Sequence, residues 1–246
     1  EIPDFSEKEA AFLQAIEFIK SIPHVDSEHL VNDYLKAGKK VLAEGAQGTL
    51  LDVDFGSYPF VTSSNTTTAG ACTGLGIAPN KIGAVYGIFK AYATRVGSGP
   101  FPTELDNETG ETLRQLGHEF GATTGRSRRT GWIDIPALKY AIMLNGVTEL
   151  IMMKADVLDT FEKISICTHY KYKGEVIDYM PYEIITNEAE PILEEIDGWN
   201  QDLTGIRSKD EIPAALANYM SYLERVLEVP IKYLSVGPDR TQTITL

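Results

Sequence analysis

Short apolar runs that end in small or charged residues recur along this chain of 246 residues, and helical patterns separate them. The clearest run covers 149–153 and is followed directly by Lys154-Ala155-Asp156, and another covers 231–234. Runs of this length predict buried strands, and strands that alternate with helices predict a mostly parallel sheet. The sequence therefore predicts an α/β fold with helices that flank a mostly parallel sheet.

Apolar residues at helical spacing predict the helices, and turn residues mark their ends. These helices are expected over residues 7–20, 28–37, 79–89, 108–116, 135–144 and 212–227. Two further strands are expected over 41–43 and 91–96, and Gly38 is the expected C-terminal cap of the second helix.

One part of the pattern departs from the parallel alternation. Residues 164–170 and 175–177 flank Lys173-Gly174, which is a hairpin signal. A small antiparallel excursion is therefore expected. The chain shows no internal repeat, low-complexity tract or linker, and it is expected to form a single α/β domain over residues 1–246.

The charge balance limits the partners. The formal net charge is -13, which repels a phosphate backbone, so neither nucleic acid nor an anionic membrane is expected as a partner. Cys72 and Cys167 lie far apart and fit no disulfide framework. No apolar run approaches the ~20 residues that cross a bilayer, and the first residues do not resemble a signal peptide. A cytoplasmic location is expected.

A local positive segment stands out against this acidic background. Between Gly121 and Gly131 the chain carries Arg126, Arg128 and Arg129, interleaved with threonines and glycines and without an acidic residue. Guanidinium groups bind carboxylates and phosphates with paired hydrogen bonds, and glycines free backbone N–H groups for the same task. The segment predicts an anion site, and a solvated basic turn is the alternative.

Other polar loops follow the predicted strands. Residues 62–68 form a polar run too hydrophilic for a core, and residues 44–49 form a small-residue turn that contains Gln47. Lys154 and Asp156, which follow the apolar run at 149–153, form a third polar segment. An ordinary surface ion pair is one interpretation of these two residues. The four histidines never occur with metal-ligand spacing, so neither a zinc site nor histidine-centred catalysis is predicted.

Taken in register, six segments closely resemble the adenylosuccinate synthetase family. They are Glu44-Gly45-Ala46-Gln47-Gly48, residues 61–67, Arg95-Val96-Gly97, residues 121–132, Lys154-Ala155-Asp156 and Ser235-Val236-Gly237-Pro238. The resemblance covers nearly all of the chain after about Lys40, and it implies a fold like that of the P-loop NTPases.

The resemblance implies a GTP-dependent carbon–nitrogen ligase of purine and AMP biosynthesis. Such enzymes join L-aspartate to IMP: the purine 6-oxygen is phosphorylated, and the aspartate amine then displaces phosphate. By resemblance, Gln47 is a catalytic residue that contacts the purine and steadies the developing oxyanion. Thr62 would bind the IMP phosphate, and Val96 would pack against the nucleoside.

The remaining site residues are also implied by the resemblance. The aspartate-binding loop would consist of Ala122, Thr123, Thr124, Gly125, Arg126, Ser127 and Arg128, with no separate role for Ser127. Arg126 would bridge aspartate and the IMP ribose, and Arg128 would meet aspartate and the GTP phosphates. Lys154, Ala155, Asp156, Ser235, Val236 and Gly237 would bind guanine, with Asp156 selecting GTP.

The resemblance reaches only the family's C-terminal half. The glycine-rich phosphate loop, the general base and the Mg²⁺ ligands of the family are absent from these 246 residues, so the chain is expected to be an inactive fragment that lacks metal ligands. The family also implies a homodimer. A non-catalytic purine-nucleotide-binding or regulatory module remains an alternative.

Overall fold

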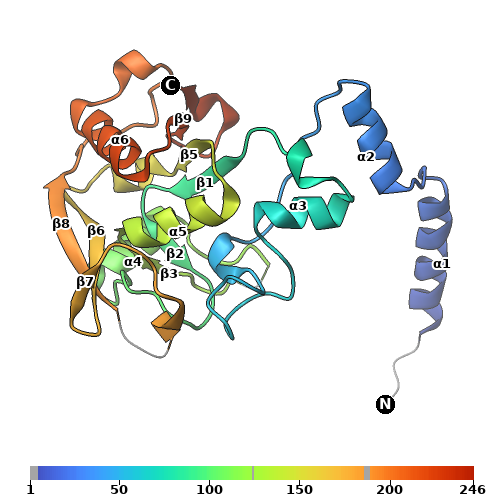
Figure 1. Ribbon diagram of the computed structural model, residues 1–246, viewed down its shortest axis with the longest axis horizontal. Coiled ribbons are helices and arrows are strands. Elements are labelled where there is room, and N and C mark those ends of the chain that lie inside the picture. The colour runs from blue at the N-terminus through green and yellow to red at the C-terminus, as the bar shows by residue number, and fades with distance from the viewer. Residues whose placement is uncertain (1–4, 124, 186–188) are drawn as a thin grey trace. The chain divides into compact units, whose positions relative to one another are not determined.

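The computed structural model describes residues 5–123, 125–185 and 189–246 (Figure 1). Contacts divide the chain into one unit of residues 1–44 with 71–78, and another of residues 45–70 with 79–246. The organisation as a single domain stays a prediction. In the described part of the chain, no helix combines the length and the apolar character needed to cross a membrane.

Helices and strands alternate along the chain. The helices are α1 (Ser6–Lys20), α2 (Ser27–Lys36), α3 (Thr68–Leu75), α4 (Glu108–Leu116), α5 (Ile135–Asn145) and α6 (Ala214–Leu227). The strands are β1 (Tyr86–Lys90), β2 (Ala93–Arg95), β3 (Arg129–Gly131), β4 (Ile133–Asp134), β5 (Glu149–Met153), β6 (Lys163–Tyr172), β7 (Glu175–Ile177), β8 (Glu190–Asp197), β9 (Ile231–Ser235) and β10 (Thr243–Thr245).

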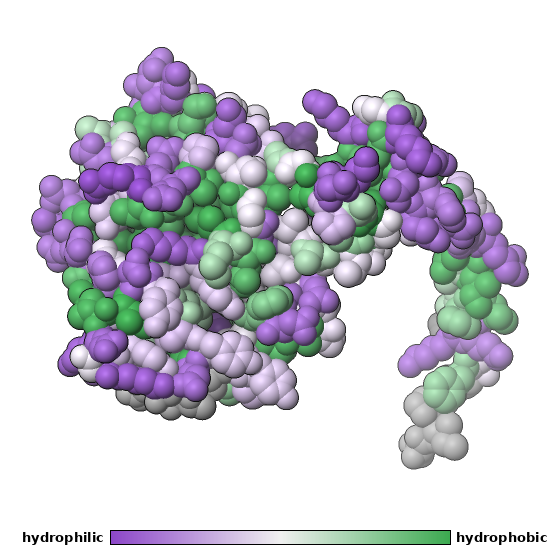
Figure 2. Space-filling model, in the orientation of Figure 1, coloured by the Kyte–Doolittle hydropathy of each residue, from purple (hydrophilic) through white to green (hydrophobic). Residues whose placement is uncertain are grey.

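The smaller unit holds α1 and α2. Its helices bury little: Phe12 and Phe18 on α1 are 64% and 68% exposed, and green patches lie between purple ones along this helix (Figure 2). Asn32 on α2 donates a hydrogen bond to the backbone oxygen of Gly76 at 3.0 Å. Both predicted helices are confirmed, and Gly38 follows α2 with the left-handed φ of +72° expected of a helix cap.

The larger unit is built on a sheet with the strand order β1-β5-β9-β10 (Figure 1). The first three strands are parallel, with Lys90 beside Met153 and Met152 beside Leu234. Strand β10 closes one edge antiparallel to β9. Met152 and Leu234 are fully buried, so the apolar runs of these strands form the core. The predicted α/β fold with parallel strands and flanking helices is confirmed.

A second sheet contains β4, β6, β7 and β8. Strands β6 and β7 pair antiparallel with Tyr172 beside Glu175, so the predicted hairpin is confirmed. Strand β8 was not predicted, because its exposed face carries acidic residues that broke the apolar pattern. It pairs antiparallel along almost the whole of β6.

Helix α5 shows how the sequence sets an element's ends. The Asp134 side chain accepts a hydrogen bond from the backbone N–H of Ala137 at the N-terminal end. Gly146 adopts a left-handed φ of +61° at the C-terminal end. Both ends were expected within one residue, as were the ends of α4.

Two predicted elements are wrong. Residues 41–43 form no strand, and Leu42 is 86% exposed because no neighbouring strand pairs with it. The helix expected over 79–89 is a short 3-10 turn at Pro79–Lys81 followed by strand β1. Pairing with β5 outweighs the helical spacing there, and Gly87 fits because a Cβ would meet Val147 Cγ1 at 2.9 Å. The strand expected over 91–96 is confirmed only for Ala93–Arg95.

Candidate active site

The carboxyl ends of three neighbouring parallel strands carry the first group of candidate residues. Lys90 ends β1, Lys154 follows β5, and Ser235 ends β9. The register places Lys90 beside Met153, and the Ala91 N–H donates to the Met153 backbone oxygen at 2.9 Å. In open α/β sheets ligands bind at this edge, so strand order alone brings the predicted guanine-binding segments together.

A buried carboxylate joins these ends to the arginine segment. Glu119 is 0% exposed and accepts hydrogen bonds from Lys90 Nζ at 2.7 Å, Tyr92 OH at 2.5 Å, Lys154 Nζ at 3.0 Å and Arg128 Nη1 at 2.9 Å. Two predicted ligand-binding side chains, those of Arg128 and Lys154, therefore share one acceptor.

The cations decide the ionisation of Glu119. Burial alone would raise its pKa, but hydrogen bonds from Lys90, Tyr92 and Lys154 outweigh burial and lower the pKa of Glu119 to about 2. Burial also lowers the pKa of the Lys90 ammonium, which Glu119 partly offsets. One negative charge thus faces three positive ones.

Asp156 lies just beyond Lys154, and its carboxylate is only partly engaged by hydrogen bonds of the described residues. Its Oδ1 is buried and has no hydrogen-bond partner among the described residues. Burial raises the pKa of this carboxyl, and the charge of Lys154 opposes the shift. Since a buried acceptor without a donor is costly, this oxygen is suited to a donor that arrives with a ligand.

The end of β9 and the segment after it are held by hydrogen bonds within the protein. Ser235 Oγ donates to the Gly237 backbone oxygen at 2.9 Å, and the Val236 N–H donates to the Gln242 backbone oxygen at 3.0 Å. Ser235 and Val236 are 2% and 0% exposed. Their side chains therefore shape the edge of the site. Ala155 is fully buried in the same way.

The arginine segment forms a hairpin. The Arg128 N–H donates to the Glu119 backbone oxygen, and the Gly121 N–H donates to the Arg126 backbone oxygen, both at 2.8 Å. Gly125 turns the tip with a left-handed φ of +64°. Ala122, Thr123, Arg126 and Ser127 are exposed near this tip, and Thr124 lies outside the described residues.

The next two residues of the segment hold the fold together. Arg129 pairs with Glu104 and also donates to the Gly99 backbone oxygen at 2.8 Å. Thr130 is fully buried, and its hydroxyl donates to the Gly110 backbone oxygen at 2.7 Å. These contacts give Arg129 and Thr130 a structural role.

Gln47 and Thr62 lie in a loop region organised by Asp52. The Asp52 carboxylate accepts from the N–H groups of Asp54, Phe55, Thr66 and Thr67. Burial raises its pKa, but these backbone donors outweigh burial and lower it. Thr66 Oγ1 donates to the Gly48 backbone oxygen at 2.7 Å, which brings the two loops together.

The backbone of Gln47 is held in an uncommon conformation. Its φ is +63°, a left-handed value that residues other than glycine seldom adopt, and its side chain is exposed. Left-handed residues of this kind cluster at ligand sites, because the surrounding structure must hold them there. Gln47 therefore keeps its place as a candidate.

Strand β2 connects these loops to the arginine hairpin. Arg95, which is 8% exposed, donates to Ser57 Oγ at 2.9 Å and to the Phe60 backbone oxygen at 3.3 Å. Arg95 also lies opposite Arg129 in the antiparallel pairing of β2 with β3, and Val96 follows directly after the end of β2. Val96 is 54% exposed. Among the predicted site residues that the structure describes, Arg128 and Lys154 are joined directly through Glu119.

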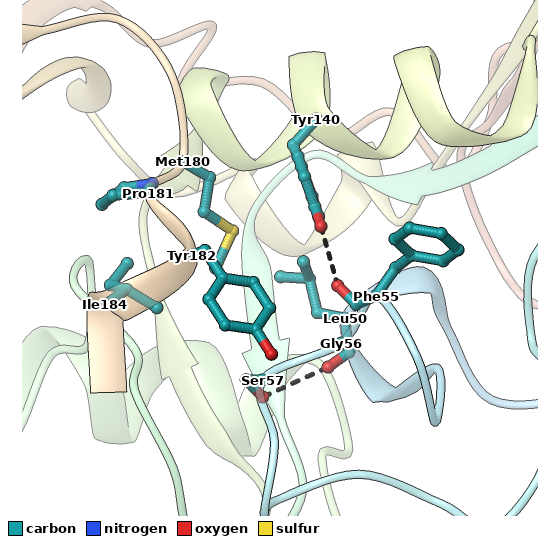
Figure 3. Close-up of a pocket in the computed structure, with 9 residues that line it drawn as sticks. All are labelled: Leu50, Phe55, Gly56, Ser57, Tyr140, Met180, Pro181, Tyr182 and Ile184. Carbon is teal, nitrogen blue, oxygen red and sulfur yellow. Dashed lines mark hydrogen bonds between the residues drawn. The ribbon is translucent and has the colours of Figure 1, made fainter. Parts of the chain in front are cut away.

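Two hollows of the surface lie apart from these residues. Leu50, Phe55, Gly56, Ser57, Tyr140, Met180, Pro181, Tyr182 and Ile184 line one (Figure 3). Tyr140 OH donates to the Phe55 backbone oxygen there at 2.8 Å. The other lies between α6 and β9 and reaches Leu246. No predicted site residue lines either hollow, so they carry no part of the assignment.

Over the described residues, no group of three or more His, Cys, Asp or Glu side chains is placed to hold a metal ion. The Mg²⁺ ligands that the family implies are therefore not gathered in such a cluster among these residues.

Sequence reasoning missed Glu119, Lys90 and Tyr92. Glu119 immediately precedes the positive segment, and an acidic residue at that boundary was the available signal. Lys90 lies just after the helix expected over 79–89, and Tyr92 lies in the strand expected over 91–96, so the predicted elements gave no reason to place the two side chains together.

Comparisons with known proteins show the family of the chain. The family model described as adenylosuccinate synthetase matches residues 3–244. Adenylosuccinate synthetases of Bacteroides thetaiotaomicron and Bacteroides fragilis are 63% and 64% identical to the chain, each over 98% of the chain. The chain spans 57% of the length of these relatives.

The solved structures agree. The fully ligated adenylosuccinate synthetase of Plasmodium falciparum superposes with a TM-score of 0.91 and 41% identity, over 99% of this chain and 58% of that one. A cyanophage S-2L succinoaminodeoxyadenylate synthetase bound to dGMP and dATP, at 20% identity and a TM-score of 0.57, shares the fold. The P-loop-like α/β fold is thereby confirmed, and the chain belongs to the adenylosuccinate synthetase family.

Proposed function

We propose that this chain provides the IMP-, aspartate- and guanine-binding part of an adenylosuccinate synthetase. In the reaction, the N1 proton of IMP is removed as the γ-phosphoryl group of GTP is transferred to the 6-oxygen, and GDP leaves. The aspartate nitrogen then bonds to C6, the C6–O bond breaks, and phosphate and a proton leave. The products are adenylosuccinate, GDP and phosphate.

The roles follow from the chemistry of each group. Gln47 would donate its amide to the 6-oxygen, where negative charge grows during phosphoryl transfer. Thr62 would donate to the IMP phosphate, and Val96 would pack on the nucleoside. Arg126 would bridge an aspartate carboxylate and the IMP ribose, and Arg128 would meet aspartate and the GTP phosphates. An amine oriented in this way reacts faster than a free one. The other loop residues, Ala122, Thr123, Thr124, Gly125 and Ser127, would surround the aspartate.

The observation that supports guanine recognition most directly is the unpartnered Oδ1 of Asp156. Guanine presents two adjacent donors, the N1–H and the exocyclic amine, and a carboxylate accepts from both. Adenine presents an acceptor at its N1 and cannot satisfy the same pair. Lys154 would lie against the base, with Ala155, Ser235, Val236 and Gly237 shaping the pocket edge.

We also propose that the protein works in the cytoplasm as a homodimer and that Mg²⁺ accompanies GTP. The described residues provide no metal site, so the metal would be held by groups elsewhere. A sedimentation measurement of the native protein would test the dimer.

Equilibrium titration of the chain with GTP and with ATP tests the guanine assignment. The two nucleotides share their phosphates, so the difference in affinity isolates the base. We expect GTP to bind more tightly, and Asp156→Asn to weaken GTP by about tenfold or more, since a lost hydrogen bond to a charged group costs about 1.5–3 kcal/mol.

Asp178→Asn is the matched control, because it removes the same charge from an exposed carboxylate that pairs with Lys139. Its GTP affinity should stay within about twofold of the original chain, since exposed pairs contribute little. Equal affinity of the unaltered chain for GTP and ATP would contradict the role of Asp156.

A further inference from the structure

The strongest unassigned feature of the molecule is the convergence of charges on Glu119. Its carboxylate contacts Lys90 and Lys154 through Oε1 and Arg128 through Oε2. The residue is fully buried, whereas the side chains of Arg128 and Lys154 remain 31% and 33% exposed. The two cations are therefore anchored at the inner side while part of each side chain still reaches solvent.

The local backbone is adapted to this arrangement. Glu119 follows α4 through a turn in which His118 has a left-handed φ of +48°. A Cβ at Gly117 would lie 2.2 Å from Tyr92 OH, so only glycine leaves room for the tyrosine that donates to Glu119. Lys154 itself has a left-handed φ of +59° and also donates to the Gly117 backbone oxygen.

The charge count separates this cluster from an ordinary buried ion pair. One carboxylate needs one cation to be neutral, yet Lys90, Lys154 and Arg128 all contact Glu119. Asp156 interacts electrostatically with Lys154 and Tyr92, so three cations face two carboxylates in the described part of the cluster and positive charge remains in excess. Positive groups that are held in place and face solvent suit an anionic ligand, because a preordered site loses little side-chain entropy on binding.

We propose that Glu119 is a positioning residue for nucleotide binding: its buried carboxylate fixes Arg128 and Lys154 relative to each other, so that the arginine hairpin and the segment after β5 meet the same nucleotide. This inference rests on the proposed function, since it assigns both cations to guanine-nucleotide binding. Glu119 itself touches no ligand and acts through the cations.

The test compares GTP affinity in Glu119→Gln with that of the original chain by equilibrium titration. Glutamine has nearly the same size as glutamate, but its NH₂ group is a donor and cannot accept hydrogen bonds from the N–H groups of the cations. We expect GTP affinity to fall by about tenfold or more, because the cations lose their common acceptor. Glu104→Gln, which breaks the Arg129 pair outside the cluster, should change the affinity by less than about twofold.

The pH profile separates positioning from a purely structural role. Without Glu119, the pKa of the half-buried Lys90 should fall further, because Lys90 lies near Lys154, Arg128, Tyr92 and Asp156 with less negative charge to hold its proton. GTP affinity of Glu119→Gln should therefore decline between pH 7 and pH 9, while the original chain and Glu104→Gln show no such decline. A general loss of packing would lower affinity equally at each pH.

Each outcome decides between the two proposals. If the original chain prefers GTP and Glu119→Gln binds it within about threefold at every pH, the positioning role is overturned and the guanine assignment stands. If the original chain shows no preference for GTP, both are overturned. If Glu119→Gln fails to fold, Glu119→Asp is measured in its place. The shorter side chain keeps the negative charge but moves the carboxylate away from its donors. Unchanged GTP affinity in Glu119→Asp would also overturn the inference.

Discussion

Glu119 and Asp134 are both buried carboxylates, and their surroundings differ in one respect. Glu119 accepts from two lysines, an arginine and a tyrosine. Asp134 accepts from Tyr170 OH at 2.6 and 2.7 Å and from the N–H of Ala137. The pKa of Glu119 is lowered to about 2, whereas burial raises the pKa of Asp134 to about 6 despite its neutral donors.

The contrast shows how a buried carboxylate that stabilises the fold differs from one that holds charged groups at a candidate binding site. Neutral donors satisfy a carboxylate without attracting further charge, which suits the helix cap of α5 inside the core. Cations do more than satisfy Glu119: they leave positive charge that faces solvent. Burial therefore identifies neither carboxylate as functional by itself, and the charge of its partners distinguishes the two.

The largest effect should come from Glu119→Leu. Removing the carboxylate leaves several half-buried cations without an acceptor, and losing one partner of a buried pair costs about 3–5 kcal/mol. We expect about 3 kcal/mol of lost stability, because the cations keep some access to water. Urea unfolding at neutral pH measures it, and a loss below about 1 kcal/mol would show that water replaces Glu119 easily.

The second effect concerns pH. The pKa of Asp134 is near 3.8 in the unfolded chain and about 6 when folded, so the folded state binds more protons between these values. The contribution of Asp134 to the free energy of unfolding should therefore fall by about 2–3 kcal/mol as pH rises through this window. The contribution of Glu119 to stability changes with pH in the opposite direction. It is present above about pH 4.5 and is lost as pH falls toward about 2.

Asp134→Asn isolates the first of these terms. Asparagine still caps α5 and accepts from Tyr170, but it does not titrate. In this variant the free energy of unfolding, measured in urea between pH 4 and pH 7, should no longer contain the contribution that falls as pH rises. A pH dependence identical to that of the original chain would refute the raised pKa of Asp134.

A pair of tyrosine variants sharpens the same comparison. Among the described residues Tyr170 is the only side-chain donor to Asp134, so Tyr170→Phe should cost about 2 kcal/mol. Tyr92→Phe leaves three cations on Glu119 and should cost about 1 kcal/mol. Thermal unfolding of both variants checks the order, and a larger cost for Tyr92→Phe would reverse the interpretation.

The smallest effect is expected for Glu104→Gln. Glu104 and Arg129 keep 32% and 29% of their side chains exposed, so water can take over from the lost carboxylate. The cost should be below about 1 kcal/mol in urea unfolding. A cost equal to that of Glu119→Leu would show that exposure does not separate the two sites.

Much of the fold was predictable from local patterns. Helices α4 and α5 carried caps that could be read from Asn107, Asp134 and Gly146, and β5 was an unbroken apolar run. Strand β1 was not predictable, because Ile82, Val85 and Phe89 also fit a helix and only pairing with β5 decides between the two. Long-range pairing is not visible in a single local window.

The site was predictable in its parts and not in its connections. The family resemblance named Arg128 and Lys154, and the structure adds that one carboxylate binds both. Glu119 gave little signal, because a single acidic residue after a helix is ordinary in a chain of net charge -13. Its importance comes from distant residues, which the sequence does not place.

The shared acceptor also bears on the order of folding. Lys90 and Lys154 lie 29 and 35 residues from Glu119 along the chain, so their contacts require closure of two long loops. Contacts of such sequence separation form slowly, after local helices. Nucleotide affinity should consequently appear late in refolding, when β1 and β5 have paired, and could serve as a signal that the chain has reached its native state.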